Sequence, residues 1–322
     1  MDIGLGIYPN QPPADLIESG KLADRLGFST LWTTDSHLLW REVYTLFGAL
    51  AVSTRNIRLA TAVTNPLTRH PTVTASAVAT LTELTGGRAI LGISIGDSAL
   101  RTMNLRIATL ATLADTVARC RALLAGEAVS FADGATARLH YGGHPVPIYI
   151  AATGPKMLKL AGQIADGVIL MNGVAPDLIS AALAILRDGE RSAGRPAGTV
   201  RVVAWAACHP NLDAVKYNVA RAILRNIPGA SDARTQAVAA AVKGAYSYEQ
   251  HGSAEAEFAR LVPDDLVGRY AFAGSPDEIA AQVDALAAIG VDEVALAVPF
   301  APGITPRDDV IRQLAPALLR RS

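Results

Sequence analysis

Residues 57–95 read IRLATAVTNPLTRHPTVTASAVATLTELTGGRAILGISI and contain one strand–helix–strand unit. The apolar runs 57–62 and 89–95 have the length of buried strands, and residues 72–84 between them have the spacing of a helix. Pro71 stands where the first turn of that helix begins, a position that tolerates proline because its N–H would have no partner there. This stretch therefore predicts two parallel strands joined by a helix, the repeating unit of α/β proteins.

The same alternation of apolar runs and amphipathic segments continues on both sides of this unit. It predicts strands over residues 3–8, 30–33, 57–62, 89–95, 148–151, 167–171, 200–207 and 293–298. It predicts helices over residues 14–26, 72–84, 108–124, 156–164, 177–193 and 276–289. Eight strands with helices between them favour a closed TIM-type (β/α)8 barrel, and 322 residues suit that fold. An open doubly wound sheet is the alternative that the pattern leaves open.

We expect one domain over residues 1–322, with two insertions that interrupt the rhythm. A hairpin is expected at about 127–146, where Gly142 and Gly143 mark a turn. A helical insertion is expected at about 211–273. Because it follows the carboxyl end of a strand, it would stand over the barrel mouth as a substrate-binding cap; a peripheral or dimer-forming insertion is the alternative. Its candidate pocket residues are Tyr217, Arg221, Arg225, Tyr246 and Tyr248.

Composition excludes several classes of function. Lys plus Arg and Asp plus Glu both number 29, so the chain lacks the basic field that nucleic-acid binding requires. The two cysteines, Cys120 and Cys208, and the histidines lack metal-ligand spacing, so no metal site is expected. No export signal opens the chain and no apolar run approaches the length of a membrane span. We expect a cytoplasmic protein that acts on a small molecule.

Polar residues follow the predicted strands, where TIM barrels build their sites. Asp35 and His37 come after strand 30–33 and could relay a proton; a capping Asp35 and a solvated His37 are the alternative. Arg69 comes after strand 57–62 and could bind a substrate carboxylate or phosphate, or form an ordinary ion pair. Gly96 and Asp97 follow strand 89–95, where glycine allows a ligand to approach the backbone.

A possible anion site follows strand 148–151. Thr153, Gly154, Pro155 and Lys156 open the next helix, whose free N–H groups suit a cofactor phosphate. A plain turn between strand and helix is the alternative. The spacings of the Walker and Rossmann phosphate loops are absent here, so neither of those nucleotide sites is expected.

Three segments in order resemble methylenetetrahydromethanopterin reductase and its relatives in the bacterial-luciferase-like superfamily. They are residues 64–71 (TNPLTRHP), 91–97 (LGISIGD), and 151–156 (AATGPK) with 161–167 (AGQIADG). The resemblance is good over residues 1 to about 195. It implies a luciferase-like barrel that binds the deazaflavin coenzyme F420 in its mouth, passes hydride between the deazaflavin C5 and an activated C=C or C=N bond of a small metabolite, and forms a homodimer.

The resemblance also implies roles for individual residues. A non-prolyl cis peptide is implied between Ala62 and Val63, behind the cofactor ring. The ring-edge contacts it implies are Asp35, Thr64, Gly96 and Asp97. The contacts it implies for the cofactor phosphate are Ala152, Thr153 and Gly154, with Pro155 and Lys156 opening the same helix.

At two positions the sequence differs from the family, and two other functions stay open. Gly6 stands where the pterin reductases carry a glutamate, and Ser36 stands where sugar- and alcohol-oxidising relatives carry a histidine. The same pterin reaction and the same proton relay are therefore not carried over. An FMN-dependent luciferase-like monooxygenase is one alternative, and a non-catalytic barrel that binds a cofactor is the other.

Overall fold

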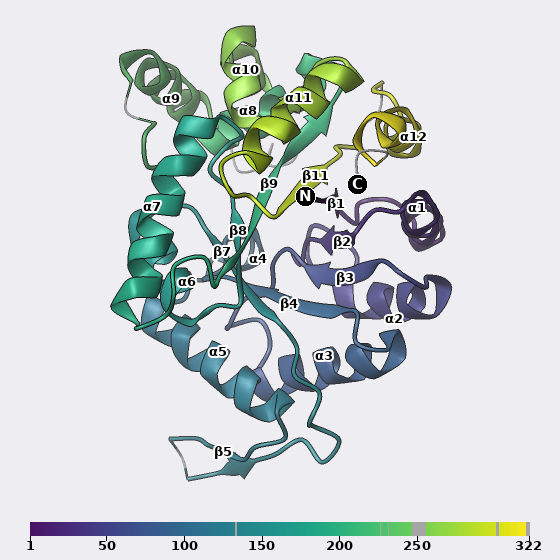
Figure 1. Cartoon of the computed structure of the whole chain (residues 1–322), viewed down its shortest axis with the longest axis vertical. Coiled ribbons are helices and arrows are strands. Elements are labelled where there is room, and N and C mark those ends of the chain that lie inside the picture. The colour runs from purple at the N-terminus through teal and green to yellow at the C-terminus, as the bar shows by residue number, and fades with distance from the viewer. Residues whose placement is uncertain (133, 226, 231, 247–255, 301–302, 320–322) are drawn as a thin grey trace.

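Eight parallel strands form the centre of the molecule and close into a barrel (Figure 1). The computed structural model describes residues 1–322 apart from 133, 226, 231, 247–255, 301–302 and 320–322. The barrel strands are β1 (Asp2–Ile7), β2 (Thr30–Thr33), β3 (Arg58–Thr61), β4 (Ala89–Ile93), β7 (Ile148–Ala152), β8 (Gly167–Leu170), β9 (Arg201–His209) and β11 (Glu293–Ala297). Because β9 pairs with both β8 and β11, and β11 pairs with β1, the ring has no free edge. The predicted TIM barrel is confirmed and the open sheet is excluded.

Helices surround the strands, as Figure 1 shows. They are α1 (Pro13–Leu26), α2 (Val43–Ser53), α3 (Pro71–Thr85), α4 (Ser98–Arg101), α5 (Leu110–Leu124), α6 (Pro155–Ile164), α7 (Pro176–Ser192), α11 (Pro276–Ala287) and α12 (Arg307–Leu318). Proline stands in the first turn of α1, α3, α6, α7 and α11, where no helical partner for its nitrogen is lost. The sequence pattern missed α2, which is almost uniformly apolar, and α12, which contains Pro316.

Two insertions depart from the strand–helix alternation. The first contains β5 (Val129–Ser130) and β6 (Thr136–Ala137), which pair antiparallel and project beside α3 and α5 at the bottom of Figure 1. The second contains η1 (Leu212–Val215), α8 (Lys216–Ile223), α9 (Ala233–Ala245), η2 (Glu257–Leu261), α10 (Asp264–Tyr270) and β10 (Phe272–Ala273). We call η1, α8, α9, η2 and α10 the cap; its helices share an apolar core of their own, which includes Val219, Phe258 and Val267. Tyr248 lies outside the described residues.

Alternation along the strands separates two apolar cores. Inward-facing side chains such as Trp32, Tyr149 and Trp205 fill the barrel, whereas their neighbours in the strands face the surrounding helices. On β1, the residues with inward parity include two glycines, Gly4 and Gly6. A Cβ on Gly6 would lie 2.7 Å from Cη2 of Trp205, so the indole occupies the volume that a side chain there would need.

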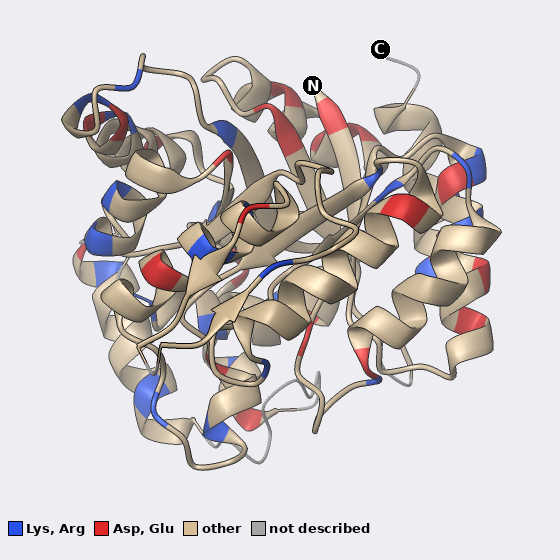
Figure 2. Cartoon of the chain, turned by 90° about the horizontal axis from the view of Figure 1, so that it is seen from below, with Lys and Arg blue, Asp and Glu red and all other residues tan. Residues whose placement is uncertain are grey.

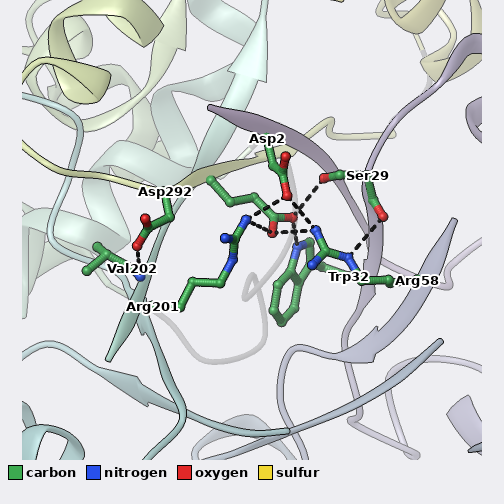
Figure 3. Close-up of polar contacts among 8 residues, drawn as sticks. Asp2, Ser29, Trp32, Arg58, Arg201, Val202 and Asp292 are labelled. Atoms are coloured by element: carbon green, nitrogen blue, oxygen red, sulfur yellow. Dashed lines mark hydrogen bonds and ion pairs between the residues drawn. The ribbon is translucent and has the colours of Figure 1, made fainter. Parts of the chain in front are cut away.

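A network of charged side chains closes the end of the barrel where the strands begin (Figure 3). Asp2 accepts hydrogen bonds from Arg58 at 2.8 Å and from Arg201 at 2.6 Å. The fully buried Glu293 accepts bonds from Trp32 Nε1 at 2.9 Å and from Arg58 at 3.3 Å. Buried charges are tolerated when they are paired and hydrogen-bonded, so this end of the barrel serves stability rather than ligand binding.

Charges of both signs are mixed over the described part of the outer surface, and Figure 2 shows basic and acidic residues interspersed over the outer helices. Within the described ranges, no three or more His, Cys, Asp or Glu residues lie together as a metal site would require. No helix in the described part of the chain combines the length and the apolar character needed to cross a membrane.

Candidate functional site

A cavity of about 690 Å³ opens at the carboxyl ends of the barrel strands, between the barrel and the cap. Its wall includes Trp205 from β9, residues that follow β2, β3, β4, β7 and β8, and four residues in and just after α8 of the cap. A volume of this size is typical of a site for a cofactor or a small organic ligand. The insertion that follows β9 therefore does contribute to the cavity, as a cap over the mouth would.

The predicted cofactor residues divide into those that line the cavity and those that do not. The residues that line it are Asp35, Ala62, Val63, Gly96, Asp97, Thr153 and Gly154. Thr64 is buried and its amide donates to the Gly92 carbonyl at 3.0 Å, and Ala152 faces the surrounding helices. Pro155 and Lys156 are exposed on the first turn of α6 and do not line the cavity.

The wall formed by Ala62 and Val63 has an unusual backbone. The peptide bond between them is cis, as the resemblance implied. Regular pairing of β3 with β4 ends at Ala60, and the Thr61 hydroxyl then donates to the Gly92 carbonyl at 2.7 Å and accepts from the Gly92 amide at 2.9 Å. A Cβ on Gly92 would overlap the Thr61 carbonyl oxygen, so only glycine fits behind this wall.

Asp35 is held by charge–charge contacts at the edge of the cavity. Arg69 donates to both of its carboxylate oxygens, at 2.5 and 3.4 Å, and to Glu42 at 2.6 Å. The guanidinium carbon of Arg69 also lies 4.9 Å from the centroid of the Tyr44 ring. Arg69 is thus an orienting partner of Asp35 and does not line the cavity, where it was expected to bind substrate.

His37 does not join Asp35 in the site. Its side chain is exposed, and residues 37–39 form a turn after Ser36 that leaves the cavity wall. Ser36 does line the cavity, and its hydroxyl lies 2.6 Å from the hydroxyl of Ser98, which also lines it. The polar group beside Asp35 is therefore a serine pair, not an imidazole.

Aromatic side chains form another part of the wall. The ring centroid of Tyr8 lies 5.4 Å from that of Trp40 and 6.2 Å from that of Trp205, the latter pair edge to face at 87°. All three residues line the cavity, and the sequence analysis overlooked them. Strand alternation could have indicated two of them: Tyr8 directly follows β1 with the parity of Gly6, and Trp205 lies in the middle of β9 with the parity of the inward-facing Val203.

The cap side of the cavity is formed by one face of α8 and the residue Arg225 just after it. Asn218, Arg221 and Ala222 of α8 line the cavity together with Arg225, in agreement with the expectation for the two arginines. Tyr217 is buried in the apolar core of the cap and does not line the cavity. Tyr246 also lies off the cavity wall; burial raises the pKa of its hydroxyl, and the nearby guanidinium of Arg221 opposes that shift.

Three lining residues carry a buried side-chain polar atom without a hydrogen-bond partner. Thr34 Oγ1, Asn218 Oδ1 and Tyr270 Oη form no hydrogen bond within the described part of the molecule. Gly96 and Gly173 bring bare backbone to the same cavity in the left-handed region, with φ of 89° and 84°. Buried polar groups are nearly always satisfied, so these atoms mark positions where a bound molecule would donate hydrogen bonds.

Comparisons with known proteins agree with this architecture. The chain is 34% identical over 317 residues to the 5,10-methylenetetrahydromethanopterin reductase of Methanolobus tindarius, covering 94% of this chain and 95% of that protein. It is 36% identical over 204 residues to the F420-dependent glucose-6-phosphate dehydrogenase of Nakamurella multipartita, covering 57% and 60%. The solved structure of the coenzyme F420 dependent tetrahydromethanopterin reductase of Methanopyrus kandleri superposes with a TM-score of 0.82 at 24% identity, covering 99% and 98%.

The family comparison covers most of the chain. Residues 1–293 match the family model described as luciferase-like monooxygenase, a span that includes the barrel strands through the first residue of β11, the cavity wall and the cap. This match, together with the 34% identity to the reductase over 94% of the chain, assigns the family. The chain belongs to the luciferase-like monooxygenase family.

Proposed function

We propose that the protein is an F420-dependent oxidoreductase that transfers hydride between the deazaflavin and an activated C=C or C=N bond of a small metabolite. The observation that carries the proposal is the convergence of residues from separate strand ends on one cavity, among them Asp35, Val63, Gly96 and Thr153. The relatives add support, because the reductase spans nearly the whole chain and the dehydrogenase is F420-dependent by name.

The residues present fit a deazaflavin. The cavity has the volume of a cofactor site, and the unpartnered Thr34 Oγ1 and Asn218 Oδ1 can accept hydrogen bonds from ring N–H or side-chain hydroxyl groups. The first turn of α6 has no side-chain cap, so its N–H groups are available to the cofactor phosphate next to Thr153 and Gly154.

When bound, the deazaflavin supplies or accepts a hydride at C5. The protein's part is to orient the reactants and to exclude water from them. The flat wall of Ala62 and Val63 can support one face of a ring, and the cap covers the mouth. Because Arg69 engages both carboxylate oxygens, we assign Asp35 to accepting a hydrogen bond from the ring edge rather than to relaying a proton with His37.

An FMN-dependent monooxygenase is the second candidate, favoured by the description of the matching family. Both candidates use the same barrel and the same wall. The non-catalytic cofactor-binding barrel is the third, and it predicts cofactor binding without turnover.

Cofactor titration separates these functions. Purified protein is titrated with F420 and with FMN while cofactor fluorescence and the thermal unfolding midpoint are followed. Saturable F420 binding with a raised midpoint, and none with FMN, supports the proposal; preference for FMN refutes it. A screen of reduced F420 against compounds with activated C=C and C=N bonds then follows oxidation of the cofactor, and no turnover with any of them favours the non-catalytic barrel.

A homodimer and a cytoplasmic location stay predictions of the same proposal. Exposed apolar side chains on neighbouring outer helices, Val52 on α2 and Val73 and Leu84 on α3, give a surface through which two copies could associate. Light scattering of the purified protein would measure the mass in solution, and a monomer at micromolar concentration would contradict the dimer.

A further inference from the structure

One face of α8 is turned toward the cavity. Asn218, Arg221 and Ala222 follow the i, i+3, i+4 spacing that places side chains on one side of a helix, and all three line the cavity. The other side of α8 packs into the apolar core of the cap through Val219, Ala220 and Ile223. This packing directs Arg221 at the cavity, and Arg225 joins it there from the segment just after α8.

No ion pair within 4 Å joins either of these two arginines to a carboxylate of the described residues, although the charge of Asp97 acts on Arg225 from farther away. The other charges of the wall are already compensated: Asp35 pairs with an arginine behind it, and Asp97 pairs with Arg101 at 2.8 Å. Among the described lining residues, the cap side of the cavity therefore carries two positive charges, Arg221 and Arg225, with Asp97 as the carboxylate whose charge acts on Arg225.

The surroundings of Arg225 make these two positive charges costly without a ligand. Burial lowers the pKa of Arg225, and the positive charge of the neighbouring Arg221 lowers it further, while the negative charge of Asp97 only partly opposes these two effects. Buried charges are normally paired, because a guanidinium that loses water must recover its hydrogen bonds elsewhere. Two neighbouring guanidiniums present several N–H donors in a fixed fork, which is the geometry that recognises carboxylates and phosphates.

The aromatic side chains of the cavity indicate which chemical group of a ligand would lie next to its anionic group. The ring of Tyr8 contacts those of Trp40 and Trp205, and all three residues line the same cavity as the arginines. Trp205 lies across Gly6, so an indole occupies the volume that a side chain at position 6 would need. Aromatic side chains favour stacked or edge contacts with flat rings, so this wall offers an apolar surface rather than an acid.

We propose that Arg221 and Arg225 form an anion site for the substrate, which carries a carboxylate or phosphate bound there and a flat, aromatic part that lies against Tyr8 and Trp205. This inference rests on the proposed function, since it names the substrate class of the same cavity. The anionic tail of F420 is the other source of the same chemistry, and the experiment separates the two.

The test uses two probes that share a phenyl ring: phenyl phosphate, which is negatively charged, and phenol, which is neutral. Binding to the full-length protein is measured by tryptophan fluorescence, excited where neither probe absorbs, because Trp40 and Trp205 line the site. The variants are Arg221→Gln, Arg225→Gln and Arg225→Lys. Arg234→Gln is the matched control, since Arg234 lies in the cap on α9, exposed and paired with Asp265 at 2.7 Å.

We expect Arg221→Gln and Arg225→Gln each to weaken phenyl phosphate binding roughly 10- to 100-fold, the size of one lost hydrogen-bonded charge contact. Phenol binding should change less than about twofold, and Arg225→Lys should recover part of the loss because it keeps the charge. Arg234→Gln should match the parent protein. Without probe, Arg225→Gln should unfold no earlier than the parent, because it removes a buried charge that Asp97 compensates only in part.

Equal weakening of phenyl phosphate and phenol, or no weakening at all, would overturn the anion site. A second comparison uses F420 and its tail-less riboflavin-level analogue. If Arg225→Gln weakens F420 about tenfold but leaves the analogue unchanged, the arginines serve the cofactor tail and the substrate assignment is overturned. If F420 fails to bind the parent protein while phenyl phosphate binds in an Arg225-dependent way, the proposed function fails and the anion site stands.

Discussion

The contact between Gly92 and the end of β3 allows the cavity wall to be tested by one methyl group. Gly92→Ala would place a Cβ in overlap with the Thr61 carbonyl oxygen, 3.0 Å from the Thr61 carbonyl carbon and 3.2 Å from Val63 Cγ1. Overpacking a buried site costs about 1–3 kcal/mol, and the upper end applies because a backbone carbonyl cannot rotate away. We therefore expect a loss of about 3 kcal/mol in the free energy of unfolding.

This loss corresponds to a measurable change in the unfolding midpoint. Globular proteins have an unfolding entropy of about 2.1 cal/mol/K per residue, so the 322 residues here give roughly 0.7 kcal/mol/K and a midpoint about 4 °C lower. Because the overlap displaces the Ala62–Val63 wall, F420 affinity should fall as well. Both quantities are obtained by thermal unfolding and by fluorescence titration of the folded variant.

The matched control is Gly48→Ala in α2, where an added Cβ meets nothing within 4 Å. Alanine is favoured over glycine inside a helix by about 0.5–1 kcal/mol, so this variant should unfold roughly 1 °C later and bind F420 unchanged. If Gly92→Ala unfolds within 1 °C of the parent and binds F420 equally well, the assignment of this wall to the cofactor is refuted.

Three further changes test the site and the barrel. Asp35→Asn should lower F420 affinity and turnover together, each by roughly 10-fold or more, because it removes a charged acceptor oriented by Arg69. Glu293→Ala should cost about 2–4 kcal/mol in unfolding free energy, since it leaves Arg58 and a buried indole N–H without this acceptor, while turnover below the midpoint stays unchanged. Burial lowers the pKa of His209, so the stability it contributes is present above the unfolded value of about 6.5 and is lost as pH falls below it.

A specific result would contradict each of these three predictions. If Asp35→Asn loses turnover but keeps its affinity for F420, Asp35 acts in proton transfer and not in cofactor binding. A midpoint unchanged in Glu293→Ala would show that the network at the strand starts contributes no net stability. For the third, midpoints measured from pH 7.5 to about 5 should fall less in His209→Asn, whose amide oxygen can still accept the bond from the Asn211 amide; equal falls would contradict the assignment.

The strands and the main helices were predictable because their signal is local. A buried strand reads as a short apolar run and an amphipathic helix as a 3.6-residue period, and neither depends on what lies far away in the chain. The strand after Ser29 illustrates this, because the predicted and observed bounds of β2 are both 30–33. The helix α2 was missed for the same reason, because its uniform apolar composition carries no period.

The candidate site was only partly predictable. Which residues line the cavity depends on where each side chain points and on contacts between residues far apart in the chain. Loop positions identified Asp35, Gly96 and Thr153 correctly as neighbours of the cavity, since strand ends meet in any TIM barrel. Whether a neighbouring side chain faces the cavity could not be read from the loops: His37 turns outward, two residues after Asp35.

The sequence by itself determined the barrel, the place of its mouth and the family, because periodicity and local motifs encode these features. Only the tertiary structure decided that Arg69 orients Asp35, that Trp205 covers Gly6, and that Arg221 of α8 and Arg225 just after it both line the cavity. These contacts join residues far apart in the chain, and they come into existence only when the barrel closes and the cap packs over it.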